Sequence, residues 1–218
     1  MKINKLSQKL IDQIAAGEIV ERPASIVKEL LENSIDSGAD NISVKIFDGG
    51  SRLIIVSDNG TGIQKDDLVL AIENHATSKI STQEDLQNCN SHGFRGEALA
   101  AIASVASVKI RSKTSHSENG FELVRTSGDW AVYLSPGDNG TDIIVEDLFH
   151  NVPARKRFLK NNTTEFKHCQ SIFTQLSLVY PKIEFSLFHQ GRQVLLLKKS
   201  SELSRFAEIF DLKKEQVK

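Results

Sequence analysis

The chain of 218 residues is poor in cysteine, with only Cys89 and Cys169. Their placement suits neither a zinc motif nor a disulfide framework, which favours a reducing, cytoplasmic setting. No basic and apolar leader opens the chain. The most apolar helical run, near residues 98–108, is too short and too interrupted by serine to span a bilayer. We therefore expect a soluble cytoplasmic protein with no membrane partner.

Several catalytic and nucleotide-binding motifs are also missing. The six histidines form no HExxH or comparable metal pair. There is no GxxxxGK[ST] loop, so any nucleotide must be held without a Walker-type cradle. Gly60 and Gly62 do not begin a dinucleotide fingerprint, because Lys65 stands where the third glycine should be. Internal repeats and an obvious linker are absent too.

The composition is that of a globular protein, with 39% hydrophobic and 25% charged residues. The length suits one large α/β core, or one domain and the start of another. The net charge of −1 is unevenly spread. Residues 1–150 carry 14 basic and 22 acidic side chains, whereas residues 151–218 carry 13 and 6. A basic final third is compatible with a polyanion-binding face, although it also suits an ordinary solvated surface.

The segment Pro23–Gly38 predicts one helix with both ends marked. Proline is harmless in the first turn, and glycine just past the last turn suits a left-handed closing residue. Glu29 and Asn33 are one turn apart and must project from the same side. The amide of Asn33 could hold a metal ion, and the carboxylate of Glu29 could hold a water molecule. A solvated polar face explains the same pattern.

A strand pair with a polar turn follows this helix. Residues 42–48 alternate, Gly49-Gly50 indicates a hairpin, and the apolar run 52–58 is expected at the centre of its sheet. This run ends in Asp58-Asn59-Gly60-Thr61-Gly62. The sequence suits a plain turn. Alternatively, the glycines let the backbone approach a flat ligand while Asp58 accepts its hydrogen bonds.

A second unusual loop lies between two expected helices, residues 65–73 and 98–106. Residues 81–92 are polar and aperiodic, which is typical of a lid, a binding loop or disorder. The segment ends in Gly93-Phe94-Arg95-Gly96-Glu97. Glycines at a helix N-terminus expose amide groups that bind phosphate, and Arg95 adds charge. A simple capping loop is the alternative.

The remaining periodic segments complete the expected elements. Leu6, Leu10, Ile11 and Ile14 form an apolar stripe on a helix over residues 6–16, which we expect to pack on the central helix. Later strands are expected at 105–113, 120–126, 130–135 and 141–147, then a helix at 164–180. A last hairpin spans 183–199, before a short helix at 201–210.

Four of these features together resemble the nucleotide-binding domain of the GHKL ATPases. They are Glu29-x-x-x-Asn33, Asp58-x-Gly60-x-Gly62, the 93–97 segment, and Gly140-Thr141 at the start of a strand. This superfamily includes gyrase B, heat-shock ninety chaperones, histidine kinases and the MutL family. Longer sequence segments are similar to those of the MutL family of DNA mismatch repair proteins. They are residues 14–23, 27–38, 75–80, 93–99 and 147–155. His92 and His150 are small departures that touch no motif residue.

The resemblance implies a role for each motif residue. Asn33 would be the side-chain ligand of Mg²⁺, and Glu29 the general base that activates water. Asp58 would accept from the adenine amino group. The other residues that the resemblance assigns to ATP surround the base or the phosphates: Gly60, Gly62 and Thr141 at the adenine end, and Thr77, Lys79, Gly93, Phe94, Arg95 and Gly96 at the phosphates.

The resemblance also implies an architecture and a biological setting. The fold would be a two-layer α/β sandwich, with a mixed, mostly antiparallel sheet and helices on one face. Residues 1–200 would form the ATP-binding domain, and residues 201–218 a helix and tail leading to a second domain that supplies a lysine to the γ-phosphate. Slow Mg²⁺-dependent ATP hydrolysis, impaired in this chain alone, would gate closure of the lid. It would also gate homodimerisation and the engagement of partners. These partners would be a MutS-type mismatch sensor, a repair nuclease or helicase, and DNA, which would be bound weakly and without sequence preference. Repair would bring the protein to the nucleoid.

Two alternatives stay open from the sequence. Another GHKL enzyme is one, although a histidine kinase would need a phosphoacceptor helix upstream and a topoisomerase should pass DNA strands. A DNA-binding module with a vestigial pocket is the other. The presence of Glu29, Asn33, Asp58 and Gly62 together argues against a vestigial pocket.

Overall fold

The computed structural model describes residue 4, residues 6–79, residue 93 and residues 96–212. Its helices are α1 (Gln8–Ile19), α2 (Pro23–Asp36), η1 (Asp48–Gly50), α3 (Asp67–Leu70), α5 (Ala98–Val105), α6 (Pro153–Phe158), α7 (Asn162–Val179) and α8 (Glu202–Ile209). Its strands are β1 (Asn41–Phe47), β2 (Leu53–Asp58), β3 (Ser107–Lys113), β4 (Gly120–Thr126), β5 (Asp129–Ser135), β6 (Gly140–Glu146), β7 (Glu184–His189) and β8 (Arg192–Leu197).

The described strands form one sheet in the order β5-β4-β3-β6-β2-β1-β7-β8. Only β1 and β7 pair in parallel, and the other neighbours are antiparallel. The sheet is therefore mixed and mostly antiparallel, as predicted. The apolar strand β2 is central, and the hairpin predicted at Gly49-Gly50 joins it to β1 with positive φ at both glycines.

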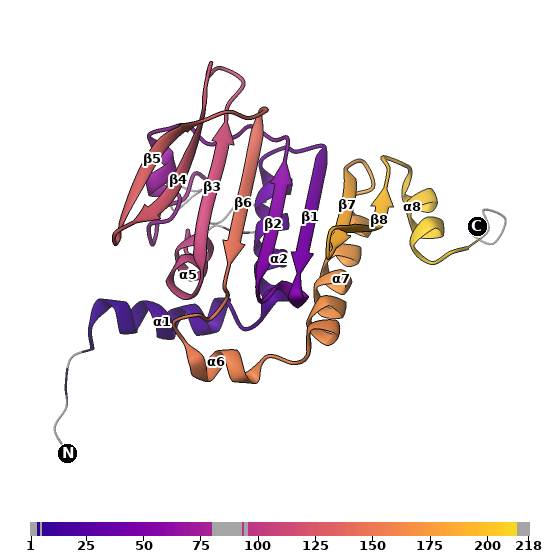
Figure 1. Cartoon of the computed structure of the whole chain (residues 1–218). Coiled ribbons are helices and arrows are strands. Elements are labelled where there is room, and N and C mark those ends of the chain that lie inside the picture. Colours follow the sequence, from indigo (N-terminus) through magenta and orange to yellow (C-terminus); the bar gives the residue numbers. More distant parts are fainter. Residues whose placement is uncertain (1–3, 5, 80–92, 94–95, 213–218) are drawn as a thin grey trace.

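Helices α2, α5 and α7 lie behind the sheet in Figure 1, so the fold has two layers. Strand residues alternate between the two faces because successive side chains of a strand point in opposite directions. In β1, Ile42, Val44 and Ile46 are fully buried beneath the helices, whereas Asn41 and Lys45 are exposed on the other face. The hydrophobic core thus lies between the sheet and α2, α5 and α7, and the opposite face of the sheet is open.

The helix predicted from Pro23 and Gly38 is present as α2. Pro23 occupies the first turn, and Gly38 lies two residues beyond the helix with a φ of 75°. Ile26, Val27 and Leu30 are fully buried. This rigid, core-packed helix therefore fixes the positions of the polar side chains on its opposite side.

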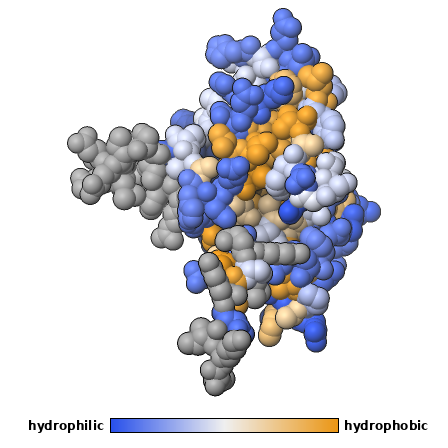
Figure 2. All heavy atoms as spheres, turned by 90° about the vertical axis from the view of Figure 1, so that its left-hand side faces the viewer, coloured by the Kyte–Doolittle hydropathy of each residue, from blue (hydrophilic) through white to orange (hydrophobic). Residues whose placement is uncertain are grey.

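The predicted apolar stripe of the first helix is wrong. Leu6, Ile11 and Ile14 are 47%, 40% and 53% exposed, whereas Ala16 of α1 and Val20, directly after the helix, are buried. The helix also continues through Gly17 to Ile19 and packs against α5 rather than α2. Small residues allow this close approach, so they mark the buried side better than the larger residues do. Figure 2 views the side where α1 and β5 lie and shows hydrophobic atoms on its surface.

Replacing one residue of this exposed stripe should cost little stability. Ile14→Ser should change the free energy of unfolding by less than about 0.5 kcal/mol, because surface substitutions seldom do more. Urea unfolding followed by circular dichroism measures this change. A loss of about 2 kcal/mol or more, as expected for truncating a buried aliphatic side chain, would mean that the stripe is buried.

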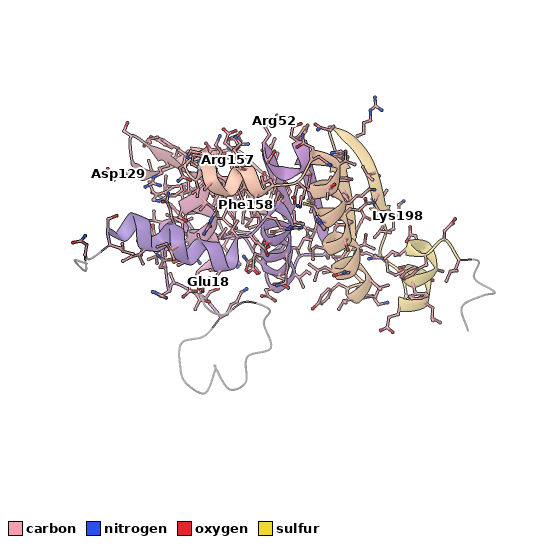
Figure 3. The ribbon with its side chains drawn as sticks, turned by 90° about the horizontal axis from the view of Figure 1, so that it is seen from below. Glu18, Arg52, Asp129, Arg157, Phe158 and Lys198 are labelled. Carbon is pink, nitrogen blue, oxygen red and sulfur yellow. The ribbon has the colours of Figure 1, made fainter. Side chains whose placement is uncertain are left out.

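One predicted helix is shorter than expected, and one observed helix was not predicted. The helix predicted at 65–73 is confined to α3, because the chain turns after Leu70 and His75 adopts a φ of 66°. Residues 153–158 form α6, which lies beside α1 at one end of the sheet (Figure 3). None of the helices in the described ranges is both long enough and apolar enough for a membrane span.

A buried arginine joins α8 to the rest of the fold. Arg205 is fully buried, and its guanidinium donates to the carbonyl oxygens of Ser177, Ile183 and Lys198 at 2.5, 2.9 and 2.9 Å. Carbonyl groups at the end of α7 and beside β7 and β8 thereby gain donors. Helix α8 thus packs on the C-terminal edge of the sheet rather than projecting from it.

Candidate functional site

Asp58 is the polar end of β2 and is held by groups from two other segments. The Ser34 hydroxyl on α2 donates to Asp58 Oδ2 at 2.8 Å, and the Gly60 amide donates to Oδ1 at 2.9 Å. Burial raises the pKa of Asp58, while hydrogen bonds from Gly60, Ser34 and the Thr141 backbone oppose that rise. A carboxylate has about four acceptor positions. The site therefore presents a fixed, partly desolvated acceptor.

The glycines after Asp58 allow the chain to pass between other segments. Gly62 has a φ of 72°, and a Cβ there would lie 2.3 Å from the Lys113 carbonyl oxygen. At Gly60, a Cβ would lie 1.9 Å from Ser37 Oγ. Both positions thus require glycine for close approach to other segments of the protein. The predicted approach of this backbone to a flat ligand stays a prediction.

Thr141 lies beside Asp58 because the two residues are paired in the β2–β6 register. It is 8% exposed, and its hydroxyl lies 2.9 Å from Ser112 Oγ. The Ser112 hydroxyl also accepts from the Ile63 amide at 2.8 Å. This network connects the turn after β2 to β3 and β6, so Asp58, Gly62 and Thr141 form one cluster.

A second cluster lies on the polar side of α2. The ammonium group of Lys79 is 3.0 Å from Asn33 Oδ1 and 2.5 Å from Asp36 Oδ2. The ammonium acts as a stand-in cation, which shows that these two oxygens fit a positive charge. Amide and carboxylate oxygens are the donors that Mg²⁺ prefers. Among the described residues, no three His, Cys, Asp or Glu side chains are grouped as a metal site, so Mg²⁺ would need phosphate and water ligands as well.

Glu29 lies one turn before Asn33 on α2, with 27% of its side chain exposed. Its Oε1 is 3.4 Å from Lys28 Nζ, which makes a closer pair with Glu32 at 2.9 Å. An exposed pair of this kind contributes little. The carboxylate of Glu29 is therefore accessible and only loosely held.

The segment around Thr77 meets the segment around Gly96. The Thr77 hydroxyl accepts from the Lys79 amide at 3.2 Å, and the His75 amide donates to the Gly96 carbonyl at 3.0 Å. A Cβ at Gly96 would lie 2.3 Å from the Ala76 carbonyl oxygen. The Cβ position of Gly93 is 3.8 Å from Lys79 Nζ. Thr77, Lys79, Gly93 and Gly96 thus lie together, whereas Phe94, Arg95 and most of the expected lid fall outside the described residues.

Sequence reasoning assigned no role to three residues that build the site: Ser34, Asp36 and Ser112. Ser34 directly follows Asn33 on α2, so it brings the Asp58 cluster next to the Asn33 cluster. Their only signal is polarity on elements that are otherwise apolar. Asp36 was recognisable as part of the polar side of its helix, but its pairing with Lys79 spans 43 residues.

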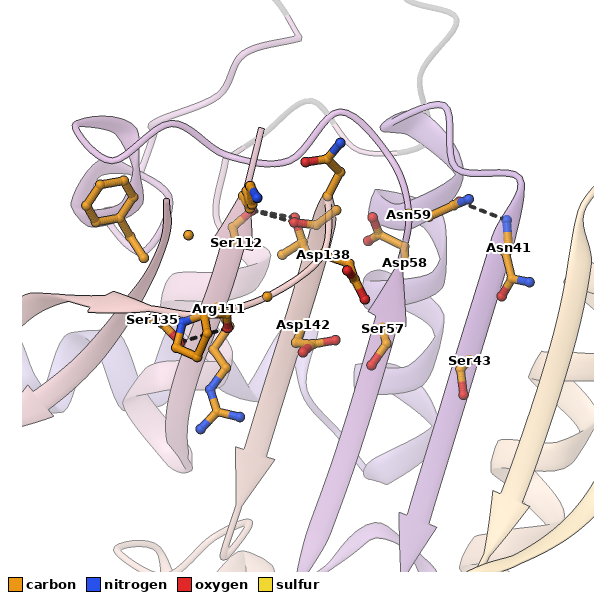
Figure 4. A pocket seen from close by; sticks show the side chains of 18 residues that line it. Asn41, Ser43, Ser57, Asp58, Asn59, Arg111, Ser112, Ser135, Asp138 and Asp142 are labelled. Carbon is orange, nitrogen blue, oxygen red and sulfur yellow. Dashed lines mark hydrogen bonds between the residues drawn. The ribbon is translucent and has the colours of Figure 1, made fainter. Parts of the chain in front are cut away.

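A hollow of about 380 Å³ lies on the open face of the sheet (Figure 4). It is lined by side chains such as Ser43, Ser57 and Asp142, which alternate with buried residues and so point away from the helices. Of the predicted site residues that the structure describes, only Asp58 and Thr141 reach its wall. The Asp58 carboxylate bonds Ser34 on the helical side, so the candidate site extends away from this hollow and meets it at Asp58 and Thr141.

Comparisons with known proteins agree with these features. Residues 21–135 match the family of histidine kinase-, DNA gyrase B- and HSP90-like ATPases. The chain is 49% identical to a DNA mismatch repair protein MutL from Shewanella woodyi and 47% identical to one from Thiobacillus denitrificans. These alignments cover 89% and 96% of this chain, which spans 32% and 35% of the relatives' lengths.

A solved structure supports the same assignment at the level of the fold. The ATPase domain of Aquifex aeolicus MutL, complexed with ADP, superposes with a TM-score of 0.75 at 35% identity. The match covers 89% of this chain and 71% of that domain. The chain therefore belongs to the family of histidine kinase-, DNA gyrase B- and HSP90-like ATPases, and within that family to the MutL mismatch repair proteins.

Proposed function

We propose that this chain binds ATP with Mg²⁺ and forms the hydrolytic site of a DNA mismatch repair protein. One observation carries the proposal. The Ser34 hydroxyl donates to the Asp58 carboxylate at 2.8 Å, and the adjacent Asn33, together with Asp36, accepts from the positively charged Lys79 ammonium. One core helix thereby places a base-recognising acceptor beside a cation site, which is what an adenine nucleotide with charged phosphates requires.

The proposed roles follow this arrangement. Asp58 accepts from the adenine amino group, with Gly60, Gly62 and Thr141 around the base. Asn33 ligates Mg²⁺, which would neutralise phosphate charge when bound. Glu29 takes the proton of the attacking water, because its accessible carboxylate lies one turn from Asn33 on the same side of α2.

Phosphate groups would be bound at the other end of the site. Thr77, Lys79, Gly93 and Gly96 lie together there, and the family resemblance adds Phe94 and Arg95. The positive charges of Lys79 and Arg95 would stabilise the anionic phosphates. Phosphoryl transfer depends mainly on such positioning and charge neutralisation, so few protein groups suffice.

The wider setting is proposed from the family. Residues 1–200 would form the nucleotide-binding domain, and residues 201–218 would lead towards a second domain of a longer protein. A lysine of that domain would complete slow hydrolysis, which this chain alone would perform poorly. ATP would control homodimerisation and contacts with a MutS-type sensor, a repair nuclease or helicase, and DNA. The expected location is the cytoplasm, and during repair the protein would be at the nucleoid.

Isothermal titration with the ATP analogue AMP-PNP tests the nucleotide site directly. We expect binding in the presence of Mg²⁺ and much weaker binding when EDTA removes it. Asn33→Ala should lose the Mg²⁺-dependent part of the affinity, because the amide oxygen is the proposed side-chain ligand. If the parent chain shows no Mg²⁺-dependent binding, the proposed function is wrong.

A further inference from the structure

Lys79 contacts the very atom that the proposed function assigns to Mg²⁺. Its ammonium is 3.0 Å from Asn33 Oδ1 and 2.5 Å from Asp36 Oδ2. The side chains of Lys79 and Asp36 are only 19% and 12% exposed. Water therefore screens this ion pair less than it would screen a surface pair.

An ammonium and Mg²⁺ compete for the same amide oxygen. A Mg²⁺ ligand lies at about 2.0–2.1 Å from the ion, so an ammonium bonded to the same oxygen would be a few ångströms from a divalent charge. The repulsion between the two cations in a partly buried site would be large. Occupation of Asn33 by Mg²⁺ therefore requires Lys79 to leave it.

We propose that Lys79 is an internal counter-cation of this site, held on Asn33 by Asp36 and displaced when Mg²⁺ and nucleotide bind. This inference rests on the proposed function, and it adds Asp36 as a positioning residue. Asp36 acts through Lys79 rather than on the nucleotide. Its ion pair with Lys79 must be broken when Mg²⁺ and nucleotide bind, and so lowers the affinity for nucleotide.

The two partners differ in their freedom to move. Asp36 is the last residue of α2, a helix whose apolar side is buried in the core, so its carboxylate stays in place. Lys79 lies in an irregular segment, and its ammonium is carried by a flexible four-carbon chain. Rotation of the Lys79 side chain alone can release Asn33 and turn the ammonium towards the phosphates.

A double-mutant cycle on nucleotide affinity tests this role. Titrations with Mg²⁺ and AMP-PNP would compare the parent, Asp36→Asn, Lys79→Met and the double variant. We expect Asp36→Asn to bind about three- to tenfold more tightly, because a charge-assisted hydrogen bond that must be broken is weakened. In the Lys79→Met background, the same change should have a much smaller effect, since the ammonium that Asp36 holds on Asn33 is gone. Asp48→Asn removes an equal charge at the other end of β1 and should leave affinity unchanged.

Unchanged or weaker binding by Asp36→Asn would overturn the proposal, as would an equal effect in both backgrounds. Nitrogen-15 NMR of the lysine ammonium groups gives a second readout, with the Lys79 signal identified by its absence in Lys79→Met. Slow hydrogen exchange of this signal without nucleotide, and a shift upon adding Mg²⁺ and AMP-PNP, are expected. A parent that binds nucleotide with Mg²⁺ while showing no such shift would refute only this inference. A parent that binds no nucleotide would refute the proposed function.

Discussion

Glu29→Ala should lower the ATP turnover of the full-length protein by about 10²–10⁴-fold, the usual loss when a general base is removed. Glu29 lies one turn before Asn33 on α2, and 27% of its side chain is exposed, so water can reach the carboxylate. The affinity for AMP-PNP should change little, because the base acts on water and not on the nucleotide. Steady-state turnover and titration of the same variant separate the two effects.

Two further variants sharpen this experiment. Glu29→Gln keeps the size of the side chain but cannot take a proton, so it should lose as much turnover as alanine. Glu32→Gln removes the neighbouring carboxylate, which pairs with Lys28 at 2.9 Å, and should keep the parent's turnover. Parental turnover in Glu29→Ala would exclude Glu29 as the base.

Local sequence signals predicted most of the elements and the spacing of the site residues. Pro23 and Gly38 marked α2, and Gly49-Gly50 marked the hairpin between β1 and β2, because backbone restrictions at proline and glycine act locally. Alternation of apolar residues predicted the buried face of β1. The helical spacing of Glu29 and Asn33 likewise placed both on one side of α2.

Long-range packing was not predictable from the same signals. Ile11 and Ile14 have the spacing of a buried stripe, yet Ala16 of α1 and Val20, directly after the helix, are buried instead. Apolar spacing alone does not identify the buried side, because that side is decided by close packing against α5. Arg205 would have been expected at the surface, but it lies buried among backbone carbonyls from three separate segments.

The partners of the site residues were hidden for the same reason. Serine at position 34 is unremarkable in a helix, and only the fold shows that it holds Asp58, 24 residues away. Lys79 was predicted to contact phosphates, whereas its contacts with Asn33 and Asp36 join segments more than 40 residues apart. Residue types indicate which chemistry is possible, but the tertiary structure determines which of these groups come into contact.

Asp58→Ala should weaken ATP-analogue binding by about 10–150-fold, as a hydrogen bond to a charged acceptor contributes about 1.5–3 kcal/mol. The carboxylate is held by Ser34 and Gly60, so it is a preformed acceptor for the adenine amino group. Asp58 lies at the end of β2 and outside the hydrophobic core, so the variant should remain folded. Titration and circular dichroism of the variant measure affinity and folding separately.

Asp142→Ala is the matched control because Asp142 follows Thr141 on β6 but lines the hollow on the opposite face of the sheet (Figure 4). Its loss should leave nucleotide affinity at the parental value if the nucleotide binds on the helical side. The opposite result, with weakened binding in Asp142→Ala and parental binding in Asp58→Ala, would place the nucleotide in the hollow. The two aspartates are near neighbours on adjacent strands, so a merely nonspecific loss of local charge should affect both variants alike. A loss confined to Asp58→Ala therefore excludes the part of the hollow around Asp142 as the adenine site.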